Sequence, residues 1–128
     1  MSFGLLKFPK NDRRYVWTDH SKSKMIQYFI SESKIKGIIQ KHDRIETGIA
    51  PSTVAVMKRN DKTLNKAAPS GIGRPRQKQE ELWVMYQKTG DKKTGMRLKI
   101  ISVWRYPGVS PKKEMIIPED VLKEMENL

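Results

Sequence analysis

Apolar side chains recur at helical spacing in two stretches near the start of the chain. The first stretch, residues 19–29, follows the short β-prone run Tyr15–Trp17, and Thr18 or Asp19 is a suitable N-cap for it. Ser31 precedes a second stretch in which isoleucines recur at helical spacing. The pattern predicts a short strand and then two helices, over residues 19–29 and 32–41.

The spacing also divides the first helix into two faces. Its apolar face, expected to be buried, holds Met25, Ile26, Tyr28 and Phe29. Its polar face, expected to be opposite, holds His20, Lys24 and Gln27 at i, i+4 and i+7.

The remainder of the chain is dominated by β-prone runs. Strands are predicted over residues 44–49, 53–59, 82–87 and 96–106, with residues 89–95 as the turn between the last two. The polar, basic segment 60–79 contains two prolines and two glycines and predicts a mobile loop or a hairpin insertion. Pro118 is expected to open a last helix that runs to about residue 126.

This order, β-α-α-β-β-β-β-α, predicts an α+β fold. We expect an antiparallel sheet of about four strands, with the two N-terminal helices packed on one face and a short C-terminal helix. The length of 128 residues suits one compact domain. Its expected parts are an N-terminal extension at 1–14, the α+β domain at 15–106 with the basic insertion at about 60–79, and a C-terminal loop and helix at 107–128.

Charge narrows the choice of partner. Lys and Arg outnumber Asp and Glu by 26 to 14, which gives a formal net charge of +12 and favours nucleic acid over an anionic membrane surface. No apolar run approaches the roughly 20 residues of a membrane helix, and residues 1–14 lack the apolar core of a signal peptide, so we expect a cytoplasmic protein that does not bind a membrane. With no cysteine and two histidines, neither a metal nor another cofactor is expected.

The strand at 96–106 carries the clearest candidate surface. Arg97, Lys99 and Arg105 share one parity, so they should lie on one face of the sheet, and Trp104 and Tyr106 could stack on unpaired bases. Arg105 could clamp a phosphate, or it could pair with Glu80, with Glu81 or with the last helix.

Two further candidates lie outside this strand. His20, beside Lys24, could transfer a proton during catalysis, or it could be a helix-capping or solvent-facing histidine. Arg74 and Arg76 lie in the sequence GRPR, which resembles the core of an AT-hook and otherwise indicates a basic flexible loop.

Three short motifs resemble the RelE/BrnT-like toxin superfamily, and in particular relatives with a histidine at the start of the first helix. They are Trp17-Thr18-Asp19-His20, Ile30-Ser31-Glu32 and the strand from Lys99 to Arg105. The resemblance covers most of residues 15–106, apart from the insertion. It implies a small α+β ribonuclease, often the toxin of a toxin–antitoxin pair, that cleaves RNA without a metal by attack of the ribose 2′-hydroxyl.

On this resemblance, His20 would transfer the proton, and Arg105, with Lys99 or Lys24, would hold the phosphate. It also implies an acidic antitoxin as partner and raises the prospect of binding at the ribosome. The hypothesis is therefore an RNA-binding endoribonuclease in which the first helix and the last hairpin converge on one groove. The alternatives are a non-catalytic nucleic-acid-binding module that uses the insertion as a clamp, and a protein held at a membrane surface or ribosome by charge alone.

Overall fold

The computed structural model describes residues 9–48, 52–63, 77–93, 95–112 and 116–126. Its first half contains β1 (Tyr15–Trp17), α1 (Asp19–Tyr28), α2 (Glu32–Gln40), β2 (Arg44–Thr47) and β3 (Thr53–Arg59). The elements that follow β3 are β4 (Lys62–Thr63), β5 (Gln77–Lys78), β6 (Glu80–Asp91), β7 (Gly95–Pro107) and α3 (Glu119–Glu126).

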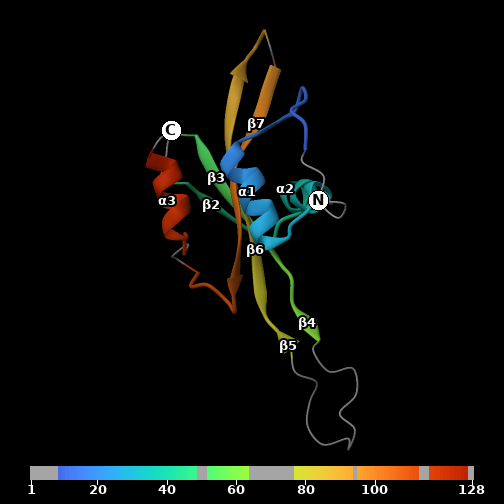
Figure 1. Ribbon diagram of the computed structural model, residues 1–128, viewed down its shortest axis with the longest axis vertical. Helices are drawn as coiled ribbons and strands as arrows, with labels where there is room; N and C mark the ends of the chain where they lie inside the picture. The colour runs from blue at the N-terminus through green and yellow to red at the C-terminus, as the bar shows by residue number, and fades with distance from the viewer. Residues whose placement is uncertain (1–8, 49–51, 64–76, 94, 113–115, 127–128) are drawn as a thin grey trace, which may run out of the picture.

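The main sheet has five strands in the order β1-β7-β6-β3-β2 (Figure 1). Every neighbouring pair is antiparallel except β1 and β7, which run parallel and pair Tyr15 with Leu98 and Trp17 with Ile100. The predicted α+β class, with two N-terminal helices and a short C-terminal helix, is confirmed. The sheet has one strand more than the roughly four expected, and the predicted short strand β1 forms its edge beside β7.

The expected helix starts are confirmed because they depend on local caps. The Thr18 hydroxyl accepts a hydrogen bond from the Ser21 N–H at 3.0 Å, and the Ser31 hydroxyl accepts one from the Lys34 N–H at 3.2 Å. α1 ends at Tyr28, and the next residue, the C-cap Phe29, has a φ of 53° in the left-handed region that stops a helix.

The last hairpin is longer than predicted. β6 and β7 pair from Glu80 with Pro107 up to Asp91 with Gly95, so most of the expected turn at 89–95 is strand. Gly90 has a φ of 99°, and a Cβ there would lie 2.1 Å from the Gly95 carbonyl oxygen, so this close pairing requires glycine. In Figure 1 this hairpin projects beyond the sheet at one end, and β4 and β5 project at the other.

The ends of the predicted insertion pair as a small hairpin, Lys62 with Lys78 and Thr63 with Gln77. Residues 64–76 lie outside the described part of the chain, and so do the Arg74 and Arg76 of the AT-hook-like sequence.

Apolar side chains fill both faces of the sheet. A first cluster contains Tyr15, Trp17, Met25, Ile30, Ile35, Ile38, Val56, Leu82, Val84, Tyr86, Ile100 and Val103. A second cluster contains Ala55, Met57, Trp83, Met85, Ile101, Trp104, Val121 and Met125. The first face is therefore covered by side chains of α1 and α2, and the second face by α3, which lies on the other side of the sheet in Figure 1.

α1 also runs along the edge of β7. At its start, the Thr18 hydroxyl donates to the Ile100 carbonyl at 3.0 Å, and at its end, Arg105 Nε donates to the Tyr28 carbonyl at 2.7 Å. The helix thus follows the part of the β7 edge that β1 does not pair, which protects that edge from other strands.

Candidate nucleic-acid interface

A β-bulge in the middle of β7 decides where its cations point. Met85 of β6 pairs with Ser102, and the next residue, Tyr86, pairs with Ile100, so Ile101 has no partner of its own. An extra residue of this kind interrupts the alternation of side chains between the two faces of a sheet.

The bulge divides the predicted row of cations. Ile100 and Val103, three residues apart, both point into the first cluster. Arg105 therefore lies on the first face with Val103, whereas Arg97 and Lys99 alternate with Ile100 and lie on the second face. The expectation that Arg97, Lys99 and Arg105 share one face is wrong.

Arg105 is held by the end of α1. Its Nε and Nη2 donate to the carbonyls of Tyr28 at 2.7 Å and Phe29 at 3.1 Å, and its Nη1 lies 2.6 Å from Oε1 of the buried Glu80. A cation at this position satisfies carbonyls that the helix end leaves open. Two roles were considered for Arg105, and the structure shows the ion pair with Glu80. The N–H groups that would clamp a phosphate are already bonded to Glu80 and to the two carbonyls.

His20 and Lys24 lie between the sheet and α3. His20 Nε2 lies 3.0 Å from the Ser102 hydroxyl, and its Nδ1 lies 3.8 Å from a carboxylate oxygen of Glu124. Lys24 Nζ contacts the Asp120 carboxylate, and its side chain is 12% exposed. α3 thus places a carboxylate against each of these two predicted catalytic residues.

The predicted faces of α1 are therefore partly wrong. Met25 is buried as expected, but Ile26 is 39% exposed and Phe29 is 59% exposed. The reason is that α1 lies along a sheet edge, so the side that carries His20 and Lys24 meets β7 and α3 rather than solvent.

His20 and Arg105 do not converge on one groove. His20 is in the first turn of α1, whereas Arg105 binds the carbonyls at the other end of this ten-residue helix, which corresponds to roughly 15 Å. The predicted groove that joins these two residues is absent from the described structure.

The surroundings of His20 change its proton affinity. Partial burial lowers the pKa of the imidazole, Lys24 lowers it further, and Glu124 opposes both by favouring the charged form. The net result is a pKa below the ordinary 6.5, so His20 is mostly neutral at pH 7. A neutral imidazole can accept a proton.

The aromatic residues do not form the expected stacking surface. Trp104 is 1% exposed and stacks on Trp83 with ring centroids 5.9 Å apart. Tyr86 is buried, which raises the pKa of its hydroxyl, and Tyr106 packs against the second cluster. In this conformation Trp104 cannot contact a base.

Cations instead accumulate on the outer part of the last hairpin. We call residues 88–99 the arm; it carries Lys88, Lys92, Lys93, Arg97 and Lys99 and one acidic residue, Asp91. Among the residues that the structure describes, no ion pair involves any of these five cations. Arg97 Nη2 donates to the Asp12 carbonyl at 2.6 Å, so this guanidinium is anchored to the segment before β1.

A buried carboxylate network was missed by the sequence analysis, which considered Glu81 only as a partner for Arg105. Glu81 accepts hydrogen bonds from the Ser110 hydroxyl at 2.6 Å, the Trp83 indole N–H at 3.0 Å and Arg59 Nη1 at 3.1 Å. Burial raises the pKa of Glu81, but the bonds from Ser110 and Trp83 and the charge of Arg59 outweigh it, so the pKa is lowered overall. The sequence signal for its burial was the position of Glu81 directly before the apolar run of β6.

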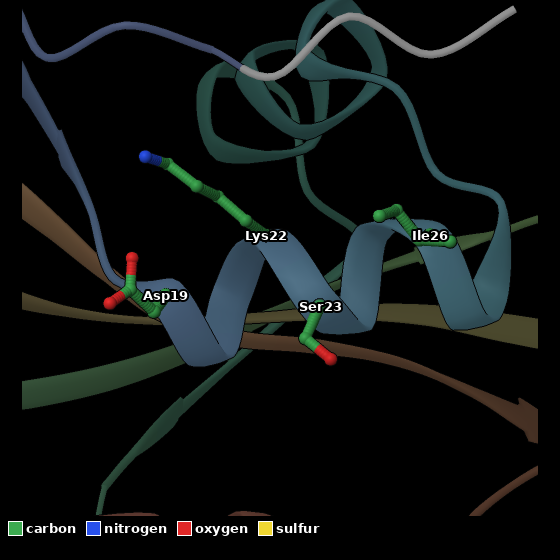
Figure 2. A pocket seen from close by; sticks show the side chains of 4 residues that line it. All are labelled: Asp19, Lys22, Ser23 and Ile26. Carbon is green, nitrogen blue, oxygen red and sulfur yellow. The ribbon is translucent and has the colours of Figure 1, made fainter. Parts of the chain in front are cut away.

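A cavity of about 430 Å³ lies on the outward side of α1, lined by Asp19, Lys22, Ser23 and Ile26. In Figure 2, Lys22 and Ile26 extend to one side of the helix and Ser23 extends to the other, so the four side chains do not converge. The cavity therefore has no converging set of side chains that would bind a ligand.

Two classes of site find no support in the described residues. Within these residues, no group of three or more His, Asp or Glu side chains could hold a metal ion. No helix in the described ranges has the length and apolar character needed to cross a membrane.

Comparison with known proteins does not identify a family. No protein-family model matches the chain, and comparisons with curated proteins and with solved structures also find no match. The resemblance to RelE/BrnT-like toxins therefore stays a hypothesis.

Proposed function

We propose that this protein binds RNA through the arm and the adjoining second face of the sheet. The observation that carries this proposal is the excess charge of the arm: five cations and one carboxylate within residues 88–99, on a hairpin that projects from the sheet (Figure 1). Cations without carboxylate partners are available to neutralise phosphates and release counterions.

The burial of the two stacked tryptophans and of Tyr86 supports contacts with the RNA backbone rather than stacking on its bases. Sequence-tolerant binding of unpaired bases uses exposed aromatic rings, but Trp83, Trp104 and Tyr86 are buried in this chain. The contacts proposed here are therefore mainly to the phosphate backbone. Such binding depends strongly on salt and weakly on sequence.

The decisive experiment compares two double variants that remove the same charge. Lys92→Gln/Lys93→Gln removes two exposed lysines of the arm, and Lys34→Gln/Lys41→Gln removes two exposed lysines in and next to α2. Fluorescence anisotropy with a short labelled RNA is measured between about 50 and 200 mM salt.

The arm variant should bind more weakly and reduce the slope of log affinity against log salt by about 1.4, the value for two lost contacts to single-stranded phosphates. The α2 variant should change both quantities much less. Equal effects of the two variants would show that net charge alone drives binding, and absence of binding by the wild-type protein would refute the proposal. Duplex RNA and DNA of the same sequence show which nucleic acid is preferred.

A second candidate function, metal-independent endoribonuclease, is favoured by His20. Its lowered pKa keeps the imidazole neutral, so the ring can accept a proton, and its Nε2 lies 3.0 Å from the Ser102 hydroxyl. In the proposed step His20 accepts the proton of a ribose 2′-hydroxyl, the 2′-oxygen bonds to phosphorus, and the bond from phosphorus to the 5′-oxygen breaks. The leaving oxygen takes up a proton from water, and a 2′,3′-cyclic phosphate remains.

Cleavage is tested with the same RNA in the presence of EDTA. The wild-type protein should give products that end in a 2′,3′-cyclic phosphate, and His20→Gln should not, although it should still bind the RNA through the arm. Binding without any product by the wild-type protein would leave the non-catalytic module as the function. An acidic antitoxin would be expected only if cleavage is found.

A further inference from the structure

α3 differs in charge from the other helices that the structure describes. Its eight residues contain four carboxylates and one lysine. α1 and α2 each contain two lysines and one carboxylate. In a chain with a net charge of +12, an acidic helix is expected to lie against cations.

Two acidic residues of α3 do lie against basic residues of α1. Asp120 contacts Lys24, and Glu124 lies 3.8 Å from His20. The two acidic residues are four apart on α3, and the two basic residues are four apart on α1, so each pair spans about 6 Å along its helix. This repeat is similar to the separation of successive phosphates in a nucleic-acid strand.

The geometry points to a phosphate-binding site that α3 covers. We propose that Lys24, His20 and Ser102 bind the RNA backbone, that Asp120 and Glu124 occupy this site in the present structure, and that RNA binds there by displacing α3. The inference rests on the proposed RNA binding and extends it, since it adds a second contact region and makes α3 an intramolecular competitor.

The site is continuous with the cations of the arm. Because of the bulge, Ser102 lies on the second face, the same face as Lys99 and Arg97. A strand of RNA that leaves Arg97 and Lys99 along β7 therefore reaches Ser102 and His20 next. At that point it meets Glu124 at the C-terminal part of α3.

The attachment of α3 is weak enough to be displaced. The helix has eight residues, and its buried apolar side chains are Val121 and Met125. Its acidic groups are partly exposed, 46% for Asp120 and 35% for Glu124, and ion pairs of this kind hold elements together only weakly. A polyanion that binds the arm gains a high local concentration at the covered site.

The test uses two double variants of the same helix. Asp120→Asn/Glu124→Gln removes the two carboxylates that face α1, whereas Glu119→Gln/Glu126→Gln removes two exposed carboxylates that do not. Both change the net charge equally. The first variant should bind RNA roughly threefold tighter or more than the second, because the competing carboxylates contribute little each but act together. Thermal unfolding of both variants verifies that the fold is retained.

A second measurement reports the displacement directly. The chain has no cysteine, so Lys123→Cys can carry a single environment-sensitive dye on the exposed side of α3. RNA should change the dye signal in the otherwise wild-type protein, and Lys24→Gln should reduce that change. RNA binding with no dye response and with equal affinity of the two acidic-residue variants would overturn this inference alone. Failure of every protein to bind RNA would instead overturn the proposed function.

Discussion

Glu81 is a buried charge whose neighbours almost all donate hydrogen bonds to it. The Ser110 N–H and hydroxyl, the Trp83 indole and Arg59 surround its carboxylate. A buried carboxylate is retained when each of its oxygens is bonded, and removing the charge then leaves donors without an acceptor. Glu81 therefore joins the start of β6 to the segment that follows β7.

Glu81→Gln should lower the free energy of unfolding by about 2–3 kcal/mol at pH 7, because the new amide N–H meets donors rather than acceptors. The lowered pKa of Glu81 means that the wild-type protein gains stability above the ordinary value of 4.5 and loses it as the pH falls through the folded-state pKa. Urea unfolding at several pH values measures both effects. A variant with wild-type stability at pH 7, and with the same loss of stability at low pH as the wild type, would contradict this role.

Arg105 has a structural role that can be separated from RNA binding. Arg105→Met leaves the buried Glu80 without its cation and opens two carbonyls at the end of α1, so we expect a loss of about 2 kcal/mol in the free energy of unfolding. Arg97→Met, in the arm, should cost less stability and weaken RNA binding more. Chemical denaturation and anisotropy on the two variants test this, and the reverse ranking would return Arg105 to the binding site.

The bulge at Ile101 marks a limit of residue-by-residue prediction. Strand alternation in the sequence placed Arg97, Lys99 and Arg105 together, and it is correct on each side of the bulge. The bulge arises from the pairing of β7 with β6, where Tyr86 follows Met85 without a gap. No local residue pattern signals that extra position, so the reversal of Arg105 could not be predicted.

At the scale of elements, features set by neighbouring residues could be predicted from the sequence, whereas features set by distant contacts could not. The starts of α1, α2 and α3 follow Thr18, Ser31 and Pro118, which act on adjacent backbone groups and were predictable. The burial of His20 depends on α3, about a hundred residues away in sequence. The polar face of α1 looked solvent-exposed because the sequence does not show which helix packs against it.

The packing of α1 against α3 should make stability depend on pH. His20 faces Lys24 on its own helix, Glu124 on α3 and Ser102 on β7, and burial lowers its pKa in the folded protein. The unfolded chain then binds the proton more readily, so stability should fall as the pH drops below 6.5 toward the folded-state pKa.

His20→Gln should remove this component and retain a side chain that can bond Ser102. The control is His42→Gln, at the exposed end of α2, which should keep the wild-type pH profile. Melting temperatures between about pH 7.5 and 5.5 provide the measurement. Stability that rises as the pH falls, or a profile altered equally by both variants, would rule out the assigned role of His20.

At the scale of the whole molecule, positive charges exceed negative charges by 12. Among the described residues, ion pairs join seven carboxylates to six lysines and arginines, so this pairing leaves the excess of positive charge in place. The remaining positive charges repel one another in the folded state. Salt screens this repulsion over distances beyond about 8–10 Å and leaves closer, partly buried pairs less affected.

The melting temperature should therefore rise when KCl is increased from about 0.05 to 0.5 M, since repulsion is screened more than attraction. Two single variants separate these terms. Lys92→Gln removes a cation of the arm with no ion pair in the described structure, so it should stabilise the protein slightly at low salt and reduce the salt effect. Lys36→Gln removes the cation that lies 3.4 Å from Glu32 and should destabilise by about 0.3 kcal/mol. A melting temperature that falls with salt, or the same sign for both variants, would show that local pairs rather than long-range repulsion dominate the stability of this chain.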